Sequence, residues 1–221
     1  RKRLRDIWAD PFERLAMKGL LAVALTSIAV TLLSGCTAAH AQVPPEAARY
    51  RLTLVREAQA AWGLNAPIAA MAAQVHQESG WRPDAMSRVG ARGLAQFMPA
   101  TATWWCGREG ISGADCLPHN PTWAIRALVG YDLHLYQRAP PRMSRYDRLW
   151  LALRGYNGGE GHWKSEARTT GLAAPTRQQI DAACGKARRS PVHCAENLGY
   201  PRRILITLQP RYAAWGPVLQ P

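Results

Sequence analysis

The sequence predicts a mainly α-helical protein, and three observations lead to this prediction. Apolar residues recur at helical spacing through most of the chain after position 45. Proline stands at or near the start of several of these periodic segments, where a helix tolerates it best. No segment shows the sustained alternation of apolar and polar residues that is typical of a half-buried strand.

The predicted helices follow a proline-containing linker at residues 43–45 and are separated by glycine- and proline-rich connectors. We expect helices over residues 46–62, 67–78, 99–105, 121–137, 146–154 and 201–214. Residues 158–189 are polar, basic and only weakly periodic. We therefore expect loops and short helical pieces in that stretch.

The N-terminal part of the chain has the pattern of an export signal. Met17-Lys18 precedes an apolar run over residues 19–33, which is short for a membrane span but suits the core of a signal peptide. The run ends in Leu33-Ser34-Gly35-Cys36, which resembles the lipobox of bacterial lipoproteins. We expect residues 1–35 to be leader and signal peptide and residues 36–48 a tether, with lipid on Cys36 attaching the protein to the outer membrane.

A second cleavage site leaves another location open. Ala39-His40-Ala41 has the small-x-small pattern of ordinary signal peptidase cleavage, which would leave a soluble periplasmic protein that begins at Gln42. An uncleaved anchor is the remaining alternative. Either cleavage implies an exported protein, and the lipobox is the interpretation that we favour.

The residues after the signal suit one domain, which we place at residues 49–215. The whole chain carries a net charge of +13, and residues 1–35 hold six Lys or Arg against three Asp or Glu, so the rest keeps +10. Such a charge attracts polyanions of any kind. An exported protein meets anionic wall polymer and membrane rather than nucleic acid, so we expect no nucleic-acid partner.

Cysteine usage also indicates an oxidising compartment. If Cys36 carries lipid, four cysteines remain, at positions 106, 116, 184 and 194. The simplest pairing joins Cys106 to Cys116 and Cys184 to Cys194, although four cysteines allow three connectivities. No CxxC occurs, and the nearby histidines lack metal-finger spacing, so we expect neither a metal nor a cofactor.

The predicted helix 67–78 points a carboxylate toward the interior. Asn65 is expected to cap its start and Gly80 to end it. Its apolar stripe consists of Ile68, Met71, Ala72 and Val75, and Glu78 is the next position on that stripe. Burial and the negative end of the helix dipole would both raise the pKa of Glu78, as the acid in glycosidic cleavage requires. The alternative is a glutamate that simply turns out to water.

The residues that follow form the most specific pattern in the chain. They are Glu78-Ser79-Gly80, Pro83, Ala85, Ser87, Gly90-Ala91, Gly93-Leu94, Gln96, Met98-Pro99 and Thr101. With the blocks LALRGYNGG at 151–159 and ENLGY at 196–200, this pattern resembles the signature of the soluble lytic transglycosylase family over about residues 60–210. Gly155 and Gly158 depart from it where the family usually has alanine, and the cysteines of the middle loops are also unusual.

The resemblance implies a lysozyme-like fold of the goose type, as a single domain with long loops, and the cysteine spacing adds the expectation that disulfides staple these loops. It also implies an enzyme that cleaves the β-1,4 bond between N-acetylmuramic acid and N-acetylglucosamine of peptidoglycan, forming 1,6-anhydromuramyl ends. Glu78 would be the single acid and base. We expect a monomer whose partner is the glycan strand.

The family pattern also implies which side chains bind the sugar. These are Ser87, Gln96, Met98, Tyr156, Asn157 and Tyr200, with Tyr156 nearest the acid. One or two of Trp81, Trp104, Trp105 and Trp163 are expected to stack on sugar rings. Asp84, the only other carboxylate in the motif, is expected to serve a turn. A hydrolytic muramidase of the same fold, which would need a second carboxylate, and a non-catalytic wall-binding lipoprotein are the alternatives.

Overall fold

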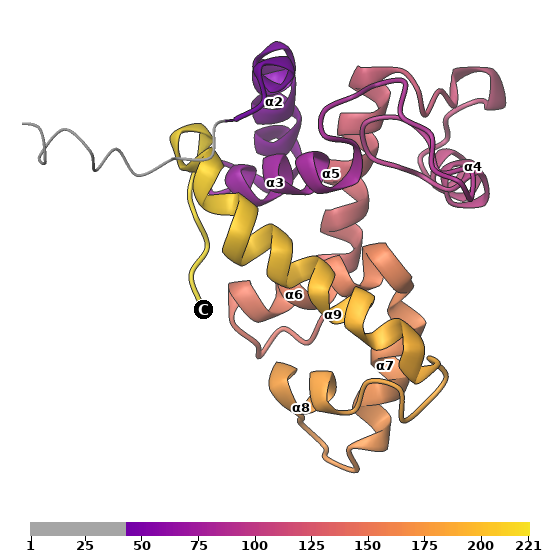
Figure 1. The fold of residues 1–221 in the computed structure, drawn as a ribbon, viewed down its shortest axis with the longest axis vertical. Helices are drawn as coiled ribbons and strands as arrows, with labels where there is room; N and C mark the ends of the chain where they lie inside the picture. Colours follow the sequence, from indigo (N-terminus) through magenta and orange to yellow (C-terminus); the bar gives the residue numbers. More distant parts are fainter. Residues whose placement is uncertain (1–42) are drawn as a thin grey trace, which may run out of the picture. The chain divides into compact units, whose positions relative to one another are not determined.

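Helices make up the regular structure of residues 43–221, the part of the chain that the computed structural model describes (Figure 1). The elements are η1 (Pro45–Tyr50), α2 (Arg51–Trp62), α3 (Ile68–Ser79), α4 (Pro99–Arg108), η2 (Gly113–Asp115), α5 (Pro121–Gln137), α6 (Arg145–Gly158), α7 (Glu160–Thr169), α8 (Arg177–Ala182), η3 (Pro191–His193), α9 (Cys194–Arg202), η4 (Arg203–Leu208) and η5 (Gln209–Trp215). Within this part no strand forms, and only isolated bridges occur around Arg92. The mainly α prediction is confirmed.

The expected leader, the lipidation site Cys36 and the alternative cleavage site at Ala41 all lie outside the described residues. Among the helices that are described, none combines the length and the apolar character needed to cross a bilayer.

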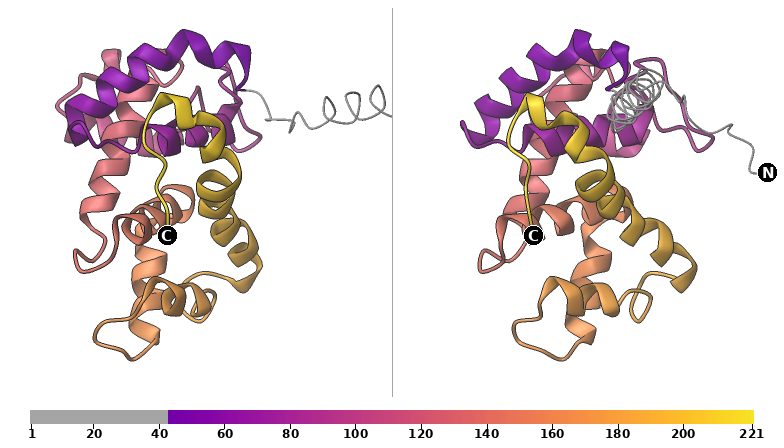
Figure 2. Two further views of the ribbon diagram at one scale, coloured as in Figure 1. Left: turned by 90° about the vertical axis from the view of Figure 1, so that its left-hand side faces the viewer. Right: turned by 60° about the vertical axis from the view of Figure 1, so that its left-hand side comes forward.

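Helix α3 lies at the centre of the hydrophobic core. Every residue from Ile68 to Val75 is buried, because pairs of alanines separate the larger Ile68, Met71 and Gln74 and so let neighbouring elements approach closely. The C-terminal run of α9, η4 and η5 packs along α3, and Figure 2 shows this run beside it from two sides. Helix α5 packs on α2 and α6, and α6 in turn packs on α7 and α9.

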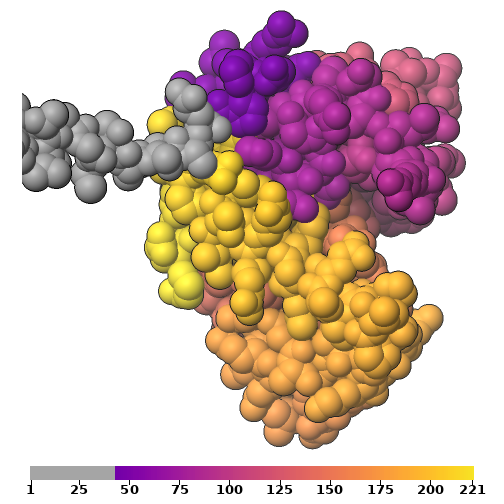
Figure 3. Space-filling model, in the orientation of Figure 1, coloured from indigo at the N-terminus to yellow at the C-terminus, as the bar shows by residue number. Residues whose placement is uncertain are grey.

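A smaller core joins α6, α7 and α8. It consists of Ala139, Leu151, Trp163 and Ile180. In the space-filling view the C-terminal run separates the N-terminal helices from this α7–α8 region (Figure 3). Two disulfides close short loops, Cys106–Cys116 beside α4 and Cys184–Cys194 before α9, which is the simplest pairing predicted from the spacing.

The predicted helices occur, with differences at their ends. The helix over 121–137 has the predicted bounds, whereas the predicted helix 46–62 divides into η1 and α2 at Tyr50. The predicted cap of α3 is wrong: Pro67 occupies the N-cap position and no side chain caps the helix. Asn65 lies two residues further out, and its carbonyl accepts a hydrogen bond from Arg145 Nη2 at 2.7 Å.

Two helical segments were underestimated. Residues 158–189 contain α7, a regular helix of ten residues, where we expected loops and short pieces. The last helical run begins at Cys194 rather than at Pro201, which lies inside α9. Proline removes one backbone hydrogen bond there, and the run continues directly as the π-helical element η4.

Candidate active site

Glu78 lies in the last turn of α3, where Gly80 ends the helix in the left-handed conformation with a φ of 60°. Its side chain is partly buried, and the Tyr200 hydroxyl donates a hydrogen bond to its Oε1. Burial raises the pKa of Glu78 to about 7, although the Tyr200 hydrogen bond stabilises the carboxylate and opposes this. A carboxyl with this pKa is present in both protonation states near neutral pH.

Two tyrosines stand beside this carboxyl. The rings of Tyr156 and Tyr200 are stacked, with centroids 6.5 Å apart and an interplanar angle of 8°. The Tyr156 hydroxyl donates to the carbonyl of Ala95 at 2.6 Å, so the expectation that Tyr156 is the nearest partner of Glu78 is wrong. Tyr200 takes that place because α9 packs on α6 and adds its buried face to the site. Burial raises the pKa of both phenols well above the ordinary value, so both remain neutral donors.

A second carboxyl, which the sequence analysis missed, lies in the same cluster. Asp132 on α5 is fully buried, and Gln74 Nε2 donates a hydrogen bond to its Oδ1 at 3.2 Å. Burial raises the pKa of Asp132 well above its ordinary value, and the charge of Glu78 raises it further. A buried stripe of α5 that includes Leu128, Val129 and Leu135 also includes Asp132, and that pattern could have revealed it.

The loop between α3 and α4 is held by its own polar side chains. Ser87 Oγ accepts a hydrogen bond from the backbone N–H of Ala91 at 2.9 Å. Gln96 Nε2 donates to the carbonyls of Ala85 at 3.1 Å and Gly93 at 2.9 Å. Both donors of the Gln96 amide are thus engaged within the loop, which leaves its oxygen as the group that can accept from a sugar.

Two features show how tightly this loop is folded. Gln96 has a φ of 48°, a left-handed conformation that non-glycine residues seldom adopt and that is common at functional sites. A Cβ at Gly93 would lie 1.9 Å from the carbonyl oxygen of Pro118, so only glycine fits there. The loop is therefore a fixed wall beside α3. Met98, which follows the loop, has 42% of its surface exposed.

The remaining predicted site residues are Asn157 and the four tryptophans that were considered for sugar stacking. Asn157 lies in a neighbouring cluster, where its Oδ1 accepts from Asn197 Nδ2 at 3.0 Å. Trp81 is fully buried, and its Nε1 donates to the Tyr212 hydroxyl at 2.7 Å, so it has no face for a sugar. Trp105 and Trp163 are buried as well, and Trp104, at 47% exposure, is the member of that set with a free face.

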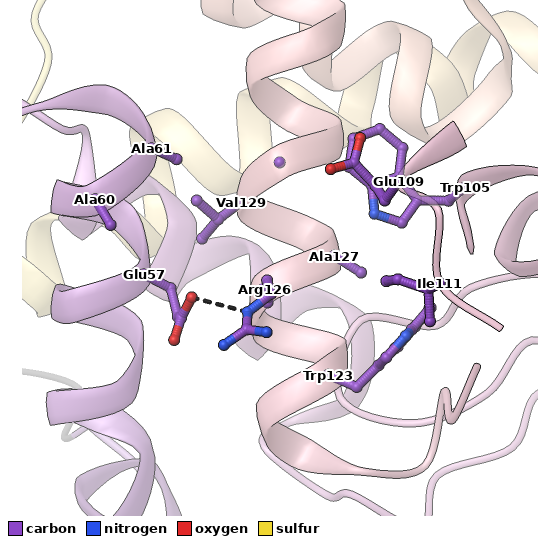
Figure 4. Close-up of a pocket in the computed structure, with 11 residues that line it drawn as sticks. Glu57, Ala60, Ala61, Trp105, Glu109, Ile111, Trp123, Arg126, Ala127 and Val129 are labelled. Atoms are coloured by element: carbon purple, nitrogen blue, oxygen red, sulfur yellow. Dashed lines mark hydrogen bonds and ion pairs between the residues drawn. The ribbon is translucent and has the colours of Figure 1, made fainter. Parts of the chain in front are cut away.

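A separate cavity of about 440 Å³ lies between α2, α4 and α5. Its walls include Trp105 and Trp123, and Arg126 Nε donates to Glu57 Oε2 across one side at 3.1 Å (Figure 4). Of the residues considered for sugar binding, Trp105 lines it, whereas Glu78 and the six residues implied by the family pattern do not. Within residues 43–221 no group of three or more His, Cys, Asp or Glu side chains is placed to hold a metal ion.

Comparison with known proteins agrees with this arrangement. The model of the family described as "Transglycosylase SLT domain" matches residues 53–177. A membrane-bound lytic murein transglycosylase F from Maricaulis maris is 41% identical over 92 residues, covering 42% of this chain and 18% of the relative. The protein of that name from Hahella chejuensis is 31% identical over 163 residues, covering 66% and 30%. The chain thus spans less than a third of the length of these relatives.

Solved structures show the same fold. A lytic transglycosylase Slt from Pseudomonas aeruginosa, an inactive glutamate-to-glutamine variant, aligns with a TM-score of 0.56 and 24% identity, covering 76% of this chain and 25% of that one. The 70 kDa soluble lytic transglycosylase of Escherichia coli aligns with a TM-score of 0.50 and 25% identity, covering 72% and 23%. Because the family model matches more than half of its 221 residues, this chain belongs to the transglycosylase SLT domain family.

Proposed function

We propose that this protein is a peptidoglycan lytic transglycosylase that cleaves the β-1,4 bond between N-acetylmuramic acid and N-acetylglucosamine and leaves 1,6-anhydromuramyl ends. The observation that carries the proposal is the Glu78 carboxyl, which Tyr200 holds at the end of α3 and whose pKa is raised to about 7. The names of the relatives, which are lytic murein transglycosylases, support the same activity.

One carboxyl performs both proton transfers in this reaction. Protonated Glu78 gives its proton to the bridging oxygen as the bond from that oxygen to the muramyl anomeric carbon breaks. The carboxylate so formed then takes the proton of the muramyl 6-hydroxyl, whose oxygen closes on the anomeric carbon. Glu78 is thereby restored to its protonated form. Tyr200 occupies Oε1, so the proton passes through Oε2.

The state of Asp132 favours this reaction over hydrolysis. Most glycosidases that use water or a covalent intermediate need a second, ionised carboxylate. Asp132 is fully buried, and burial raises its pKa well above its ordinary value, which favours the neutral carboxyl over the carboxylate that would activate water. The acetamido group of the substrate can instead assist at the anomeric carbon, as in the substrate-assisted exceptions to the two-carboxylate rule.

We assign the remaining site residues to sugar binding. They are Ser87, Gln96, Met98, Tyr156, Asn157 and Tyr200. Ser87 keeps a hydroxyl proton to donate, since its Oγ accepts from Ala91. Gln96 offers its amide oxygen, and Met98 offers an exposed apolar surface. Tyr156 supports the loop through its hydrogen bond to Ala95, and its ring stacks on that of Tyr200.

The proposed location follows from the N-terminal pattern and from the relatives. We assign residues 1–35 to the leader and signal peptide, 36–48 to the tether and 49–215 to the catalytic domain, acting as a monomer in the periplasm. The relatives are named membrane-bound, which supports attachment to the outer membrane through lipid on Cys36. Labelling of cells with radioactive palmitate tests this, because a precursor processed at Ala41 would take up no label.

Replacement of Glu78 tests the activity. Glu78→Gln is expected to lower the release of soluble fragments from purified sacculi by about a thousandfold, because a glutamine amide cannot protonate the bridging oxygen near neutral pH. Mass spectrometry of the wild-type products should show ends lighter by one water than those of hydrolysis. Asp84→Asn is the matched control, because Asp84 is exposed, and it should keep wild-type activity. Full activity of Glu78→Gln, or hydrolysed ends, would contradict the proposal.

A further inference from the structure

The Cys184–Cys194 disulfide ends on the helix that holds the partner of the candidate acid. Cys194 is the first residue of α9, and Tyr200, whose hydroxyl donates to Glu78, lies six positions further along the same helix. The other disulfide, Cys106–Cys116, closes a span of the same length, ten positions, but joins α4 to the segment after η2. The chain thus has two comparable disulfides, of which one is attached to α9.

A buried amide fixes α9 against α6. Asn197 is 1% exposed, and both the oxygen and the nitrogen of its side chain are hydrogen-bonded. Its Oδ1 accepts from Arg154 Nε at 3.0 Å, and its Nδ2 donates to the carbonyl of Arg154 at 2.9 Å and to Asn157 Oδ1 at 3.0 Å. Asn197 and Tyr200 are three positions apart and both buried, so they lie on one face of α9. The amide therefore fixes the face of the helix that directs Tyr200 to Glu78.

The loop closed by Cys184–Cys194 is also fixed at a second point. Arg189 lies in this loop, is 5% exposed, and donates through Nε to Glu166 Oε1 on α7 at 3.1 Å. Arg154 of α6 donates to Oε2, the other oxygen of the same carboxylate. The loop, α6 and α7 are thus joined through Glu166, and the disulfide connects this framework to the start of α9.

Helix α9 depends on this external support because its own structure is weak. It has nine residues, which is shorter than the ~12–15 residues below which an isolated helix is only marginally stable. No side chain caps its start, and Pro201 inside it supplies no backbone N–H. The run then continues as the π-helical element η4. The position of the Tyr200 hydroxyl is therefore set by the groups that hold α9 and not by the helix alone.

We propose that Asn197 and the Cys184–Cys194 disulfide are positioning groups for Glu78 that act through Tyr200. Asn197 bonds to α6, and the disulfide holds the start of α9, which is ~9 Å from Tyr200 along the helix axis. Without either group, α9 can shift against α6, and the Tyr200 hydroxyl no longer stays on Glu78 Oε1. The inference rests on the proposed function, in which Glu78 is the acid and base.

Direct measurement of the pKa of Glu78 tests this role. The NMR titration of its ¹³Cδ resonance reports on the carboxyl whether or not the protein acts on glycan. The Tyr200 hydrogen bond stabilises the carboxylate, so its loss raises the pKa of Glu78. The other titratable groups beside Glu78 are Tyr156 on α6 and Asp132 on α5, and the variants below retain both of them. A rise in the pKa of Glu78 therefore reports on the contact with Tyr200.

Two variants remove the positioning groups separately. Asn197→Ala and the double variant Cys184→Ala/Cys194→Ala should each raise the pKa of Glu78 by about 0.5 to 1 unit. The alkaline limb of the pH–rate profile on sacculi should move to higher pH by the same amount. In a Tyr200→Phe background, neither change should raise the pKa of Glu78 by more than about 0.2 unit, because the hydrogen bond is already absent.

The chain offers a matched control for each variant. Gln209 is also fully buried and makes three side-chain hydrogen bonds, but these join Leu205 and Leu219 of the C-terminal segment and not α6. Cys106–Cys116 closes a span equal to that of the other disulfide, so its removal relaxes the unfolded chain to the same extent. Gln209→Ala and Cys106→Ala/Cys116→Ala should therefore lower the melting temperature but leave the pKa of Glu78 within about 0.2 unit of the wild type.

Thermal unfolding shows which variants fold, and Asn197→Ser replaces Asn197→Ala if the alanine variant does not. An unchanged pKa of Glu78 in a folded Asn197 or Cys184/Cys194 variant would overturn the inference. An equal rise after removal of either disulfide, or a full rise in the Tyr200→Phe background, would overturn it as well. The expected rise in a protein whose wild type releases no anhydro ends would support the positioning role and contradict the proposed function.

Discussion

Two polar clusters both include residues of α6, and they differ in the partners that they give their carboxyls. The acid cluster consists of Glu78, Asp132, Tyr156 and Tyr200, and within the described residues no Lys or Arg bonds to either carboxyl. The ion cluster consists of Arg154, Glu166, Asp181 and Arg189. There Glu166 receives hydrogen bonds from two guanidinium groups and is fully buried.

The comparison shows that burial alone does not decide what a carboxyl does. In the ion cluster, Arg154 and Arg189 bond to the buried Glu166 and so fix the α6–α7 region. Burial still raises the pKa of Asp181, but the guanidinium groups of Arg154 and Arg177 oppose that rise. In the acid cluster, neutral phenols and an amide surround the carboxyls, and the loss of water raises their pKa values instead. The first arrangement supports the fold, and the second stores a proton that can be transferred.

The largest expected effect breaks the ion cluster. Arg154→Met should lower the free energy of unfolding by about 3–5 kcal/mol at pH 7, because the fully buried Glu166 loses one of its two guanidinium partners and Asp181 also loses a donor. Urea denaturation measures this. Arg126→Met is the control, since Arg126 is largely exposed where it pairs with Glu57, and it should cost less than about 1 kcal/mol. Equal losses in the two variants would remove the distinction between the clusters.

A smaller effect, of opposite sign, is expected in the acid cluster. An acid with a raised pKa binds its proton more tightly in the folded protein, so its contribution is full below pH 4.5 and is lost as pH rises through about 7. Glutamine does not ionise, so Glu78→Gln does not lose stability as the pH rises. The variant should therefore have a free energy of unfolding up to about 3 kcal/mol higher than that of the wild type at pH 8. Urea midpoints at pH 4.5 and pH 8 measure the difference, which should nearly vanish at the lower pH. The same difference at both would contradict the raised pKa.

Removal of one hydroxyl sharpens the account of Glu78. In Tyr200→Phe the carboxylate loses its donated hydrogen bond, so the pKa of Glu78 rises. The alkaline limb of the pH–rate profile on sacculi should move to higher pH by about one unit. Tyr136→Phe, on the α5 face that packs against Trp62, should leave the limb in place. A limb that moves to lower pH would mean that Tyr200 does not stabilise the carboxylate.

The smallest expected effect concerns Asp132. If this carboxyl is neutral while Glu78 titrates, then Asp132→Asn changes no charge near Glu78. The alkaline limb should stay within about 0.3 pH unit of the wild type, a free-energy change below about 0.5 kcal/mol. The pH–rate profile of this variant provides the measurement. A clear move of the limb to lower pH would show that Asp132 is ionised in the native protein.

Local patterns predicted much of the fold and part of the candidate site. The spacing of Ile68, Met71 and Val75 predicted that Glu78 faces inward, and Gly80 marked the end of the helix. Helix α7 escaped prediction because its buried side includes Ser165 and Glu166, which are polar. The burial of Glu166 depends on ion pairs with Arg154 and Arg189, which lie 12 and 23 positions away and outside α7.

The partners of Glu78 could not be predicted for the same physical reason. The hydrogen bond from Tyr200 joins residues 122 positions apart, and no local periodicity encodes such a contact. Asp132 could have been predicted, because it continues the apolar stripe of α5 as Glu78 continues that of α3. The same pattern thus predicted the inward-facing Glu78 on α3 and would have predicted Asp132 on α5.

The C-terminal helical run has a practical consequence for shortening the chain. Tyr200 donates a hydrogen bond to Glu78. The Tyr212 hydroxyl lies 2.8 Å from His76 Nδ1 and 2.7 Å from Trp81 Nε1. The run therefore contacts residues before, at and after the turn that carries the acid. The family match stops at residue 177. A fragment trimmed to that match would keep Glu78 but lose Tyr200 and Tyr212, which hold the turn around it. A shortened protein for assays should therefore extend through residue 215.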